Sequence, residues 1–365
     1  MIRGHGGNID EAAKRAGCFP AEIVDMSSNI NPLGPPPGLI EHLQQHMAAV
    51  CALPEVDARQ AVAAYAGWQR LLPMTVLAGA GTTQFLYQIP RALHIGAALV
   101  VAPTYADYAD ALAINGVDYR HFMLDEKNGF FPDMEKLREA ARSVDAVYVC
   151  NPNNPTGVFV PTDDLVRLAR ACPQTLFVVD ESYLPFVNDA GDDSIAHRGL
   201  ANVIVLQSLS KMFCIPGLRV GFCVAPKQMA DAVSRHSPPW AVNAPAQQAV
   251  AWIAGHAEVA AEHVARTRQF LETERAAFLH QLEGVPELQV FPGRATFMLF
   301  RHPDRPAAEV LDALLGRRFL VRDCANFTGL SDRFFRVSLK STEQNRQVSG
   351  LIADCCIRPA KEAHA

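Results

Sequence analysis

The sequence predicts an α/β protein in which a mostly parallel sheet is followed by a smaller α+β domain. Short apolar runs rich in β-branched residues alternate with helical patterns between residues 74 and 225. These runs are apolar on both faces, as is typical of parallel strands covered by helices on both sides. After Pro245 a long helical pattern leads into a segment in which strands and helices follow each other in a different rhythm, which indicates a second, smaller domain.

The expected elements can be placed along the chain in order. Residues 32–38 read PLGPPPG, which predicts a stiff connector, and an amphipathic stretch follows at 39–50. The expected strands of the large sheet are 74–78, 98–102, 145–150, 176–180, 202–206 and 218–222, with helices at 83–93, 105–115 and 162–172. The helical pattern after Pro245 is interrupted near Gly255 and continues to about Leu282. The C-terminal part predicts strands near 288–291, 296–301, 319–322 and 334–338, and helices near 307–316 and 342–355.

From this order we divide the chain into three parts. Residues 1–45 are expected to form an N-terminal arm and part of the small domain, and residues 46–245 the large domain. Residues 246–365 are expected to form an interdomain helix and the rest of the small domain. The 365 residues and their 49% hydrophobic content are enough for two domains with their own cores.

Composition and charge exclude several classes of function. The 33 basic and 38 acidic residues give a net charge of −5 without any basic run, so neither a nucleic acid nor an anionic membrane is an expected partner. Residues 1–15 lack an apolar signal region, and the 9 cysteines form no CxxC pair, so we expect a cytoplasmic protein without a metal site. Residues 71–90 and 236–257 are uncharged, but their prolines, glycines and polar residues argue against membrane helices.

Polar motifs rich in glycine or proline follow five of the expected strands. They are GAGTT at 79–83, PTYADY at 103–108, NPNNPTG at 151–157, DESY at 180–183 and SLSK at 208–211. Because ligands of open α/β sheets bind beyond the carboxyl ends of the strands, we expect these motifs to converge on one site. The glycines of GAGTT suit a phosphate at the start of the following helix, although an ordinary β–α turn explains them equally well.

Three charged residues within or next to these motifs carry distinct chemistry. Lys211 has apolar and small neighbours and no acidic residue from 194 to 230, which favours a lowered pKa and Schiff-base chemistry; a solvated loop lysine is the alternative. Asp180 ends an apolar strand, where it is either a structural cap or ion pair, or the partner of a protonated pyridine nitrogen. Arg219 offers a guanidinium suited to a phosphate.

Together with GLRVGF at 217–222, these motifs resemble the fold-type I pyridoxal-phosphate (PLP) enzymes of the aminotransferase class I/II superfamily. The resemblance implies a mostly parallel seven-stranded sheet, a homodimer, and PLP as cofactor. It implies that Lys211 is the Schiff-base lysine and that Asp180 is the partner of the pyridine nitrogen. The other implied contacts are Tyr183 and Asn154 with the phenolic oxygen, Tyr105 stacked on the ring, and Gly81, Thr82, Thr83, Ser208, Ser210 and Arg219 around the phosphate.

The ends of the chain carry a narrower resemblance. Residues 5–14, 25–38, 238–244 and 321–339 resemble the L-threonine O-3-phosphate decarboxylases, which are close relatives of histidinol-phosphate aminotransferases. The resemblance implies a PLP-dependent carboxy-lyase that forms (R)-1-amino-2-propanol phosphate for the nucleotide loop of corrinoids. It also implies a carboxylate site at Arg336 with Asn154, and a site for the substrate phosphate at His5, Gly6, Asn29 and Arg322.

Alternatives remain open at this point. The sequence does not show which Cα bond of the substrate stands perpendicular to the cofactor ring, so a histidinol-phosphate-type aminotransferase is an alternative, as is decarboxylation of L-serine O-phosphate. A non-catalytic protein of the same fold is a further alternative, which Lys211, Asp180 and Arg219 together disfavour. The chain also departs from the family: Leu53 replaces a tyrosine that contacts the cofactor of the partner subunit, and Ala80, Gln84 and Thr296 replace other expected residues.

Overall fold

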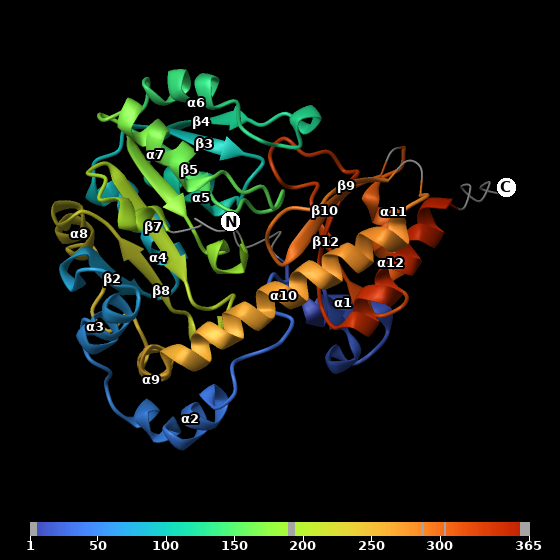
Figure 1. Cartoon of the computed structure of the whole chain (residues 1–365), viewed down its shortest axis with the longest axis horizontal. Coiled ribbons are helices and arrows are strands. Elements are labelled where there is room, and N and C mark those ends of the chain that lie inside the picture. Colours follow the sequence, from blue (N-terminus) through green and yellow to red (C-terminus); the bar gives the residue numbers. More distant parts are fainter. Residues whose placement is uncertain (1–5, 189–193, 286–287, 303, 358–365) are drawn as a thin grey trace.

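A computed structural model describes residues 6–188, 194–285, 288–302 and 304–357, and its largest feature is a seven-stranded sheet (Figure 1). In the order β2-β8-β7-β6-β5-β3-β4, the strands are Val76–Gly79, Gly221–Val224, Val203–Ser208, Leu176–Asp180, Ala146–Cys150, Ala97–Ala102 and Asp118–Met123. All pairs from β7 to β4 are parallel, whereas β8 runs antiparallel to both of its neighbours. The expected mostly parallel sheet of an α/β protein is therefore confirmed.

Two details of this sheet differ from the prediction. Strand β4 was not expected, because none of its residues is buried and its sequence DYRHFM has no apolar run. As an edge strand it pairs only with β3, so it needs no continuous apolar pattern. The strand expected at 218–222 begins only at Gly221, because residues 216–218 form a short 3-10 helix and Arg219 has a left-handed backbone with φ 53°.

Helices cover the sheet, and every residue of β5 and β6 is buried. The helices along this part of the chain are α3 (Arg59–Trp68), α4 (Thr82–Ala92), α5 (Asp107–Ile114), α6 (Met134–Ala141), α7 (Thr162–Ala171) and α8 (Lys227–Ser234). They follow the strands in the alternating order that the sequence predicts for α4, α5 and α7. Among the described residues, no helix has the length and apolar character needed to span a membrane.

A long helix joins the seven-stranded sheet to a second layer of structure. Helix α9 (Ala244–Gly255) is followed at once by α10 (Ala257–Leu282), which runs diagonally across the molecule (Figure 1). The second sheet is antiparallel, with the order β12-β13-β10-β9, and its strands are Arg322–Asp323, Phe334–Ser338, Phe297–Arg301 and Gln289–Phe291. Helices α11 (Ala307–Leu315) and α12 (Thr342–Ile357) complete this part.

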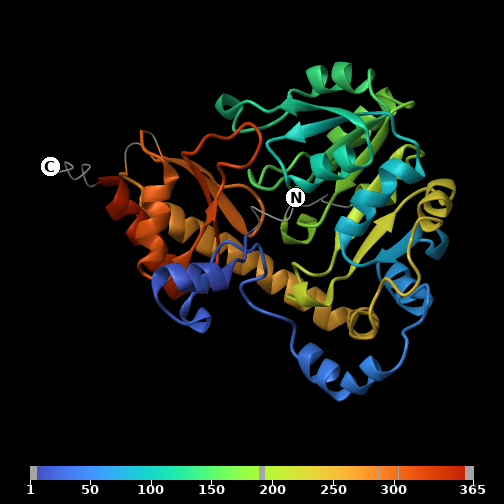
Figure 2. The ribbon, with the colours of Figure 1, turned by 180° about the vertical axis from the view of Figure 1, so that it is seen from behind.

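The N-terminal segment belongs in space with the C-terminal elements. Helix α1 (Ile9–Ala16) shares an apolar cluster with Leu315 of α11 through Ala12 and Ala13. In Figure 2 this blue helix lies beside the orange and red C-terminal elements, and β1 (Val24–Asp25) pairs in parallel with β11 (Phe319–Leu320). The single strand expected at 319–322 is therefore two short strands in different sheets. Helix α2 (Leu39–Gln45) lies instead against α9. The division of the chain at residues 45 and 245 stays a prediction.

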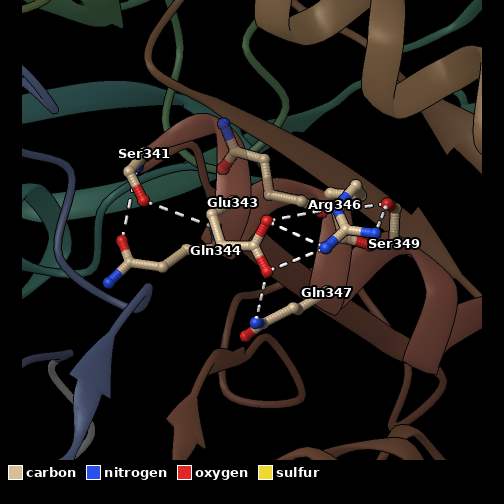
Figure 3. Close-up of polar contacts among 7 residues, drawn as sticks. Ser341, Glu343, Gln344, Arg346, Gln347 and Ser349 are labelled. Atoms are coloured by element: carbon tan, nitrogen blue, oxygen red, sulfur yellow. Dashed lines mark hydrogen bonds and ion pairs between the residues drawn. The ribbon is translucent and has the colours of Figure 1, made fainter.

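The last helix begins with a reciprocal cap (Figure 3). The backbone N–H of Gln344 donates to the hydroxyl of Ser341 and the backbone N–H of Ser341 donates to the Gln344 side chain, both at 3.3 Å. One turn on, Arg346 donates to Glu343 at 2.9 Å. A capping box satisfies N–H groups that a helix start leaves free. It fixes the start of α12, which packs against α10 and α11.

Candidate active site

A cavity of about 390 Å³ lies at the carboxyl ends of strands β5, β6 and β7, and the second sheet and the N-terminal segment close its other side. It collects nearly all of the residues that the sequence predicts for the site: Gly6, Asn29, Gly81, Thr82, Thr83, Tyr105, Asn154, Asp180, Tyr183, Ser208, Ser210, Lys211, Arg219, Arg322 and Arg336. His5, the remaining predicted residue, lies outside the described residues. The convergence of strand ends is thus a feature of the structure.

Lys211 lies in the turn after β7 and lines the cavity. Burial lowers its pKa to about 8, and the nearby charges of Arg219 and Arg336 act in the same direction, while Asp180 opposes them. The backbone around the lysine is tied to the N-terminal segment, because the Asn31 N–H donates to the Lys211 carbonyl at 3.0 Å. Because the pKa of Lys211 is about 8, a large fraction of its amine is neutral near pH 8, as a nucleophilic lysine requires.

Asp180 presents a buried carboxylate at the end of β6. The Tyr108 hydroxyl donates to its Oδ2 at 2.9 Å, and the backbone N–H of Ser182 donates to its Oδ1 at 2.9 Å. Burial raises the pKa of this carboxyl, although both donors and the charge of Lys211 act to lower it. Burial makes an unpaired negative charge unfavourable. A carboxylate held in this way therefore suits a cationic ring nitrogen, whose positive charge would stabilise the ionised form.

The start of helix α4 forms an anion cradle. Gly81 is its N-cap residue, with φ +82° and no side-chain cap, so the first N–H groups of the helix face the cavity through Thr82 and Thr83. A Cβ atom at Gly81 would lie 2.7 Å from Nη2 of Arg219, and one at Gly221 would lie 2.5 Å from the backbone nitrogen of Thr82. Both glycines are needed for this close packing. Helix N–H groups beside a guanidinium are well suited to a phosphate.

Tyr183 and Asn29 form a buried pair in the cavity lining. The Asn29 amide donates to the Tyr183 hydroxyl at 2.9 Å, and the Ser338 hydroxyl donates to Asn29 Oδ1 at 2.9 Å. Burial raises the pKa of Tyr183 to about 12, opposed by Arg336 and by this bond from Asn29. Because the Tyr183 oxygen already accepts this bond, its own proton is available to an acceptor in the cavity.

Two arginines from the second sheet complete the lining. Arg336 on β13 donates to Asn154 Oδ1 and to the Ser27 carbonyl, while its buried Nε has no partner among the described residues. Arg322 on β12 is its Cα partner across the strand pair. Like charges that face each other across a sheet are unfavourable. An anionic ligand beside them would remove this cost and use the unpaired Nε.

These residues fit PLP. The cavity combines a lysine with a lowered pKa, a buried carboxylate and an anion cradle that any side chain at Gly81 would fill. Tyr105 adds an aromatic ring to the lining, held by a bond from its hydroxyl to Asp107 at 2.6 Å. An amine, a ring-nitrogen partner, a stacking ring and a phosphate cradle are the groups that this cofactor needs.

Comparison with known proteins agrees with this geometry. The family model described as aminotransferase class I and II matches residues 21–351. This chain belongs to that family. It is 34% identical over 350 residues to the threonine-phosphate decarboxylase of Salmonella typhimurium, and the match covers 94% of each chain. It is 30% identical over 351 residues to the histidinol-phosphate aminotransferase of Methanothermobacter thermautotrophicus, and that match covers 94% of this chain and 91% of the other. The crystal structure of L-threonine-O-3-phosphate decarboxylase from Porphyromonas gingivalis superposes with a TM-score of 0.80 at 28% identity, covering 91% of this chain and 98% of that one.

As a member of the aminotransferase class I and II family, the chain is a PLP-dependent enzyme, and the fold and cofactor predicted from the motifs are confirmed. Its departures from the family pattern have visible structural results. Leu53 is exposed, whereas Gln84 accepts a hydrogen bond from the Ala80 N–H at 2.8 Å and so keeps the GAGTT turn closed. Thr296 is fully buried, and its hydroxyl has no partner among the described residues.

Sequence reasoning missed several residues of this family member's site. Tyr108 bonds Asp180, while Phe327 and Ile30 add apolar side chains to the cavity lining. Phe327 also lies under the Arg322 guanidinium, which is 5.2 Å from the ring centroid. The PTYADY motif contained a signal for Tyr108, because Tyr105 and Tyr108 are three residues apart and such residues lie on the same face of a helix. Nothing in the local sequence marks Phe327 or Ile30, which reach the cavity only through tertiary packing.

Proposed function

We propose that this enzyme decarboxylates L-threonine O-3-phosphate and forms (R)-1-amino-2-propanol phosphate for the nucleotide loop of corrinoids. The observation that carries the proposal is the facing pair Arg322 and Arg336, which lines one cavity from neighbouring strands. A phosphorylated amino acid carries two anionic groups, a carboxylate and a phosphate, and so offers one to each guanidinium. The 34% identity to a threonine-phosphate decarboxylase over 94% of both chains supports the same reading.

In this proposal the residues on the seven-stranded sheet hold the cofactor. Lys211 would hold it through its amine, Asp180 at the ring nitrogen, and Tyr105 against the ring. The phenolic oxygen of the PLP ring would accept hydrogen bonds from Tyr183 and Asn154. The remaining contacts would be those to the phosphate, from Gly81, Thr82, Thr83, Ser208, Ser210 and Arg219, all of which line the cavity.

When bound, PLP supplies an electron sink for the pair that is released at the substrate α-carbon. Arg336, with Asn154, would hold the substrate carboxylate, while Gly6, Asn29 and Arg322 would lie around its phosphate, with His5 as a further predicted contact. After CO₂ has left, the α-carbon needs a proton, and Lys211 Nζ is the acid that we assign to deliver it, since its pKa of about 8 suits proton transfer near neutral pH.

A histidinol-phosphate-type aminotransferase is the second candidate, and the 30% identity to such an enzyme favours it. In that reaction Arg322 would serve the phosphate of the imidazole-bearing substrate, Arg336 would serve the carboxylate of the oxo-acid acceptor, and Lys211 would remove a proton from the α-carbon. L-Serine O-phosphate differs from the threonine compound by one methyl group, which a pocket distinguishes by only about 1–3 kcal/mol. Phe327 and Ile30, two apolar residues of the cavity lining, are the side chains that we assign to recognition of such a methyl group.

The deciding experiment is product identification with threonine phosphate, serine phosphate and histidinol phosphate in parallel. The proposal expects CO₂ and an amino alcohol phosphate from threonine phosphate, without any oxo-acid acceptor. Lys211→Ala should abolish both the visible cofactor band and the product. Transfer of the amino group to 2-oxoglutarate without CO₂ release would contradict the proposal and support the aminotransferase.

We also propose a homodimer. Leu53, Val56 and Trp240 are apolar and exposed, with 76%, 51% and 47% of their surface accessible. The Trp240 N–H donates to the Val56 carbonyl at 2.9 Å, so these two residues adjoin, and Leu53 lies three residues before Val56 in the chain. Contiguous exposed apolar surface of this kind is typical of subunit interfaces. Leu53→Asp should give monomers in light scattering, whereas Phe19→Asp, at an equally exposed site beside α1, should leave the dimer intact. A wild-type protein that is monomeric at micromolar concentration would contradict the proposal.

A further inference from the structure

A buried polar cluster lies directly behind the strand ends that line the cavity. Its members are Glu181, Gln207 and Tyr65, here called the rear network. They line a second cavity of about 270 Å³, which adjoins the first at Ser208. Two of them are chain neighbours of proposed cofactor residues, since Glu181 follows Asp180 and Gln207 precedes Ser208. Successive side chains of a strand point to opposite faces, so these neighbours face the front and the rear of the same strand ends.

The rear network is held together by hydrogen bonds across three elements. The Tyr65 hydroxyl on α3 donates to Gln207 Oε1 at 2.7 Å, and Gln207 Nε2 donates to Glu181 Oε2 at 3.2 Å. Glu181 also accepts from the Ser194 hydroxyl, and from the Ile195 N–H at 2.9 Å. Its carboxylate therefore has donors on both oxygens. Burial nevertheless raises its pKa to about 7, because the side chain is only 3% exposed.

The same network reaches the phosphate cradle. The Tyr65 ring is stacked on Phe222 of β8, with centroids 3.5 Å apart and planes at 3°. Phe222 follows Gly221, the residue whose missing Cβ leaves room for the Thr82 backbone nitrogen. In the sheet, Gln207 pairs with Phe222 and Ser208 pairs with Gly221. Tyr65 thus contacts the rear side of both strands whose front side meets the cradle.

We propose that the rear network is a positioning device that holds the Asp180 carboxylate and the phosphate cradle at a fixed separation and so sets the affinity for PLP. The cofactor is rigid, and it must reach both ends of this site at once. The Tyr65–Gln207 bond ties α3 to β7, and the Gln207–Glu181 bond ties β7 to the end of β6. Together they restrain the distance between these elements, although none of the three residues lines the front cavity. The inference rests on the placement of PLP in the proposed function.

The test uses a phenylalanine that removes one hydrogen bond and keeps the aromatic stack. Tyr65→Phe deletes the bond to Gln207 while its ring can remain on Phe222. Tyr148→Phe is the matched control, because Tyr148 is a fully buried tyrosine of the same sheet whose hydroxyl has no partner among the described residues. Both apoproteins are titrated with PLP, and the dissociation constant is read from the visible band. Unfolding temperatures are measured with and without PLP.

The proposal expects Tyr65→Phe to raise the dissociation constant of PLP about three- to tenfold, the effect of one hydrogen bond, and to reduce the rise in Tm that PLP produces. Tyr148→Phe should leave both quantities unchanged. Glu181→Gln should act in the same direction, and its combination with Tyr65→Phe should cost less than the sum of the two, since both act through Gln207.

Two results would overturn the inference. One is a dissociation constant for Tyr65→Phe equal to that of Tyr148→Phe. The other is an equal fall in Tm for the apo and PLP-bound forms, which marks a purely structural residue. The readout is separate from the proposed reaction: wild-type protein that binds PLP but releases no CO₂ from threonine phosphate contradicts the decarboxylase alone, while the change in PLP affinity still decides the role of the rear network.

Discussion

The hydroxyl of Tyr108 donates a 2.9 Å hydrogen bond to Oδ2 of Asp180, and both side chains are buried. This bond joins the first turn of α5 to the end of β6 across the sheet. It leaves the Asp180 carboxylate with one orientation, because Ser182 holds the other oxygen. The contact matters because a buried carboxylate without donors takes up a proton and loses its charge.

Tyr108→Phe should therefore weaken the site without unfolding the protein. Loss of a hydrogen bond to a charged group costs about 1.5–3 kcal/mol, part of which should appear as a lower kcat. The pKa of Asp180, already raised by burial, should rise further. The acidic limb of the pH profile of kcat should therefore move to higher pH. The measurement is kcat against pH for this variant, with Tyr148→Phe as control. An unchanged profile would show that the bond is only structural.

The lowered pKa of Lys211 predicts how fast the apoprotein captures an aldehyde. Only the neutral amine is nucleophilic, so the rate should rise with pH and level off above a midpoint near 8, whereas an ordinary lysine with a pKa of 10.5 would still be rising at pH 9. Pyridoxal, which has no phosphate, is the probe. Arg219→Gln should move the midpoint upward, because removal of a nearby positive charge makes the ammonium form less unfavourable. A midpoint above 10 in the wild type would contradict this.

The Arg322 guanidinium is expected to act on the substrate phosphate. Arg322→Gln should raise KM for threonine phosphate by about tenfold or more, with a smaller effect on kcat, because a charge-assisted contact to the phosphate is lost from bound substrate and transition state alike. Inhibition by inorganic phosphate should weaken in parallel. Arg317→Gln, on an exposed arginine outside the cavity lining, is the control. Equal KM values for both variants would remove Arg322 from the phosphate site.

Gly81→Ala separates backbone strain from the loss of the phosphate cradle. Gly81 has φ +82°, and a Cβ there would meet the Arg219 guanidinium at 2.7 Å. Gly116→Ala is the matched control, since Gly116 has φ +70° but a Cβ atom there would have no heavy atom within 4 Å. Both should lose about 1 kcal/mol of stability. Only Gly81→Ala should also lower PLP affinity by about tenfold or more, as seen in a titration of the apoprotein, because the cradle must open to admit the methyl group. Equal PLP affinities of Gly81→Ala and Gly116→Ala would contradict the assignment of the Gly81 turn as the phosphate site.

Much of the fold could be predicted from patterns that are local in sequence. The buried strands β5 and β6 are apolar on both faces, so their runs were visible. The break between α9 and α10 was visible for a different reason, because Gly255 interrupts a helical pattern. Strand β4 was not, because an edge strand carries polar residues. Strand β8 was expected at 218–222 but lies at Gly221–Val224. Its start is later because Arg219 adopts a left-handed conformation that propensity does not suggest for arginine.

The chain order of motifs determined on its own that Lys211, Asp180 and the Gly81 turn share one site, because parallel strands deliver their carboxyl ends to the same edge of a sheet. Only the tertiary structure decided what lies around them. The pairing of Arg322 with Arg336, the bond from Tyr108 to Asp180 and the rear network all join residues far apart in sequence. Such contacts depend on how helices and sheets pack, and side-chain hydrogen bonds across that packing leave no periodic trace in the sequence.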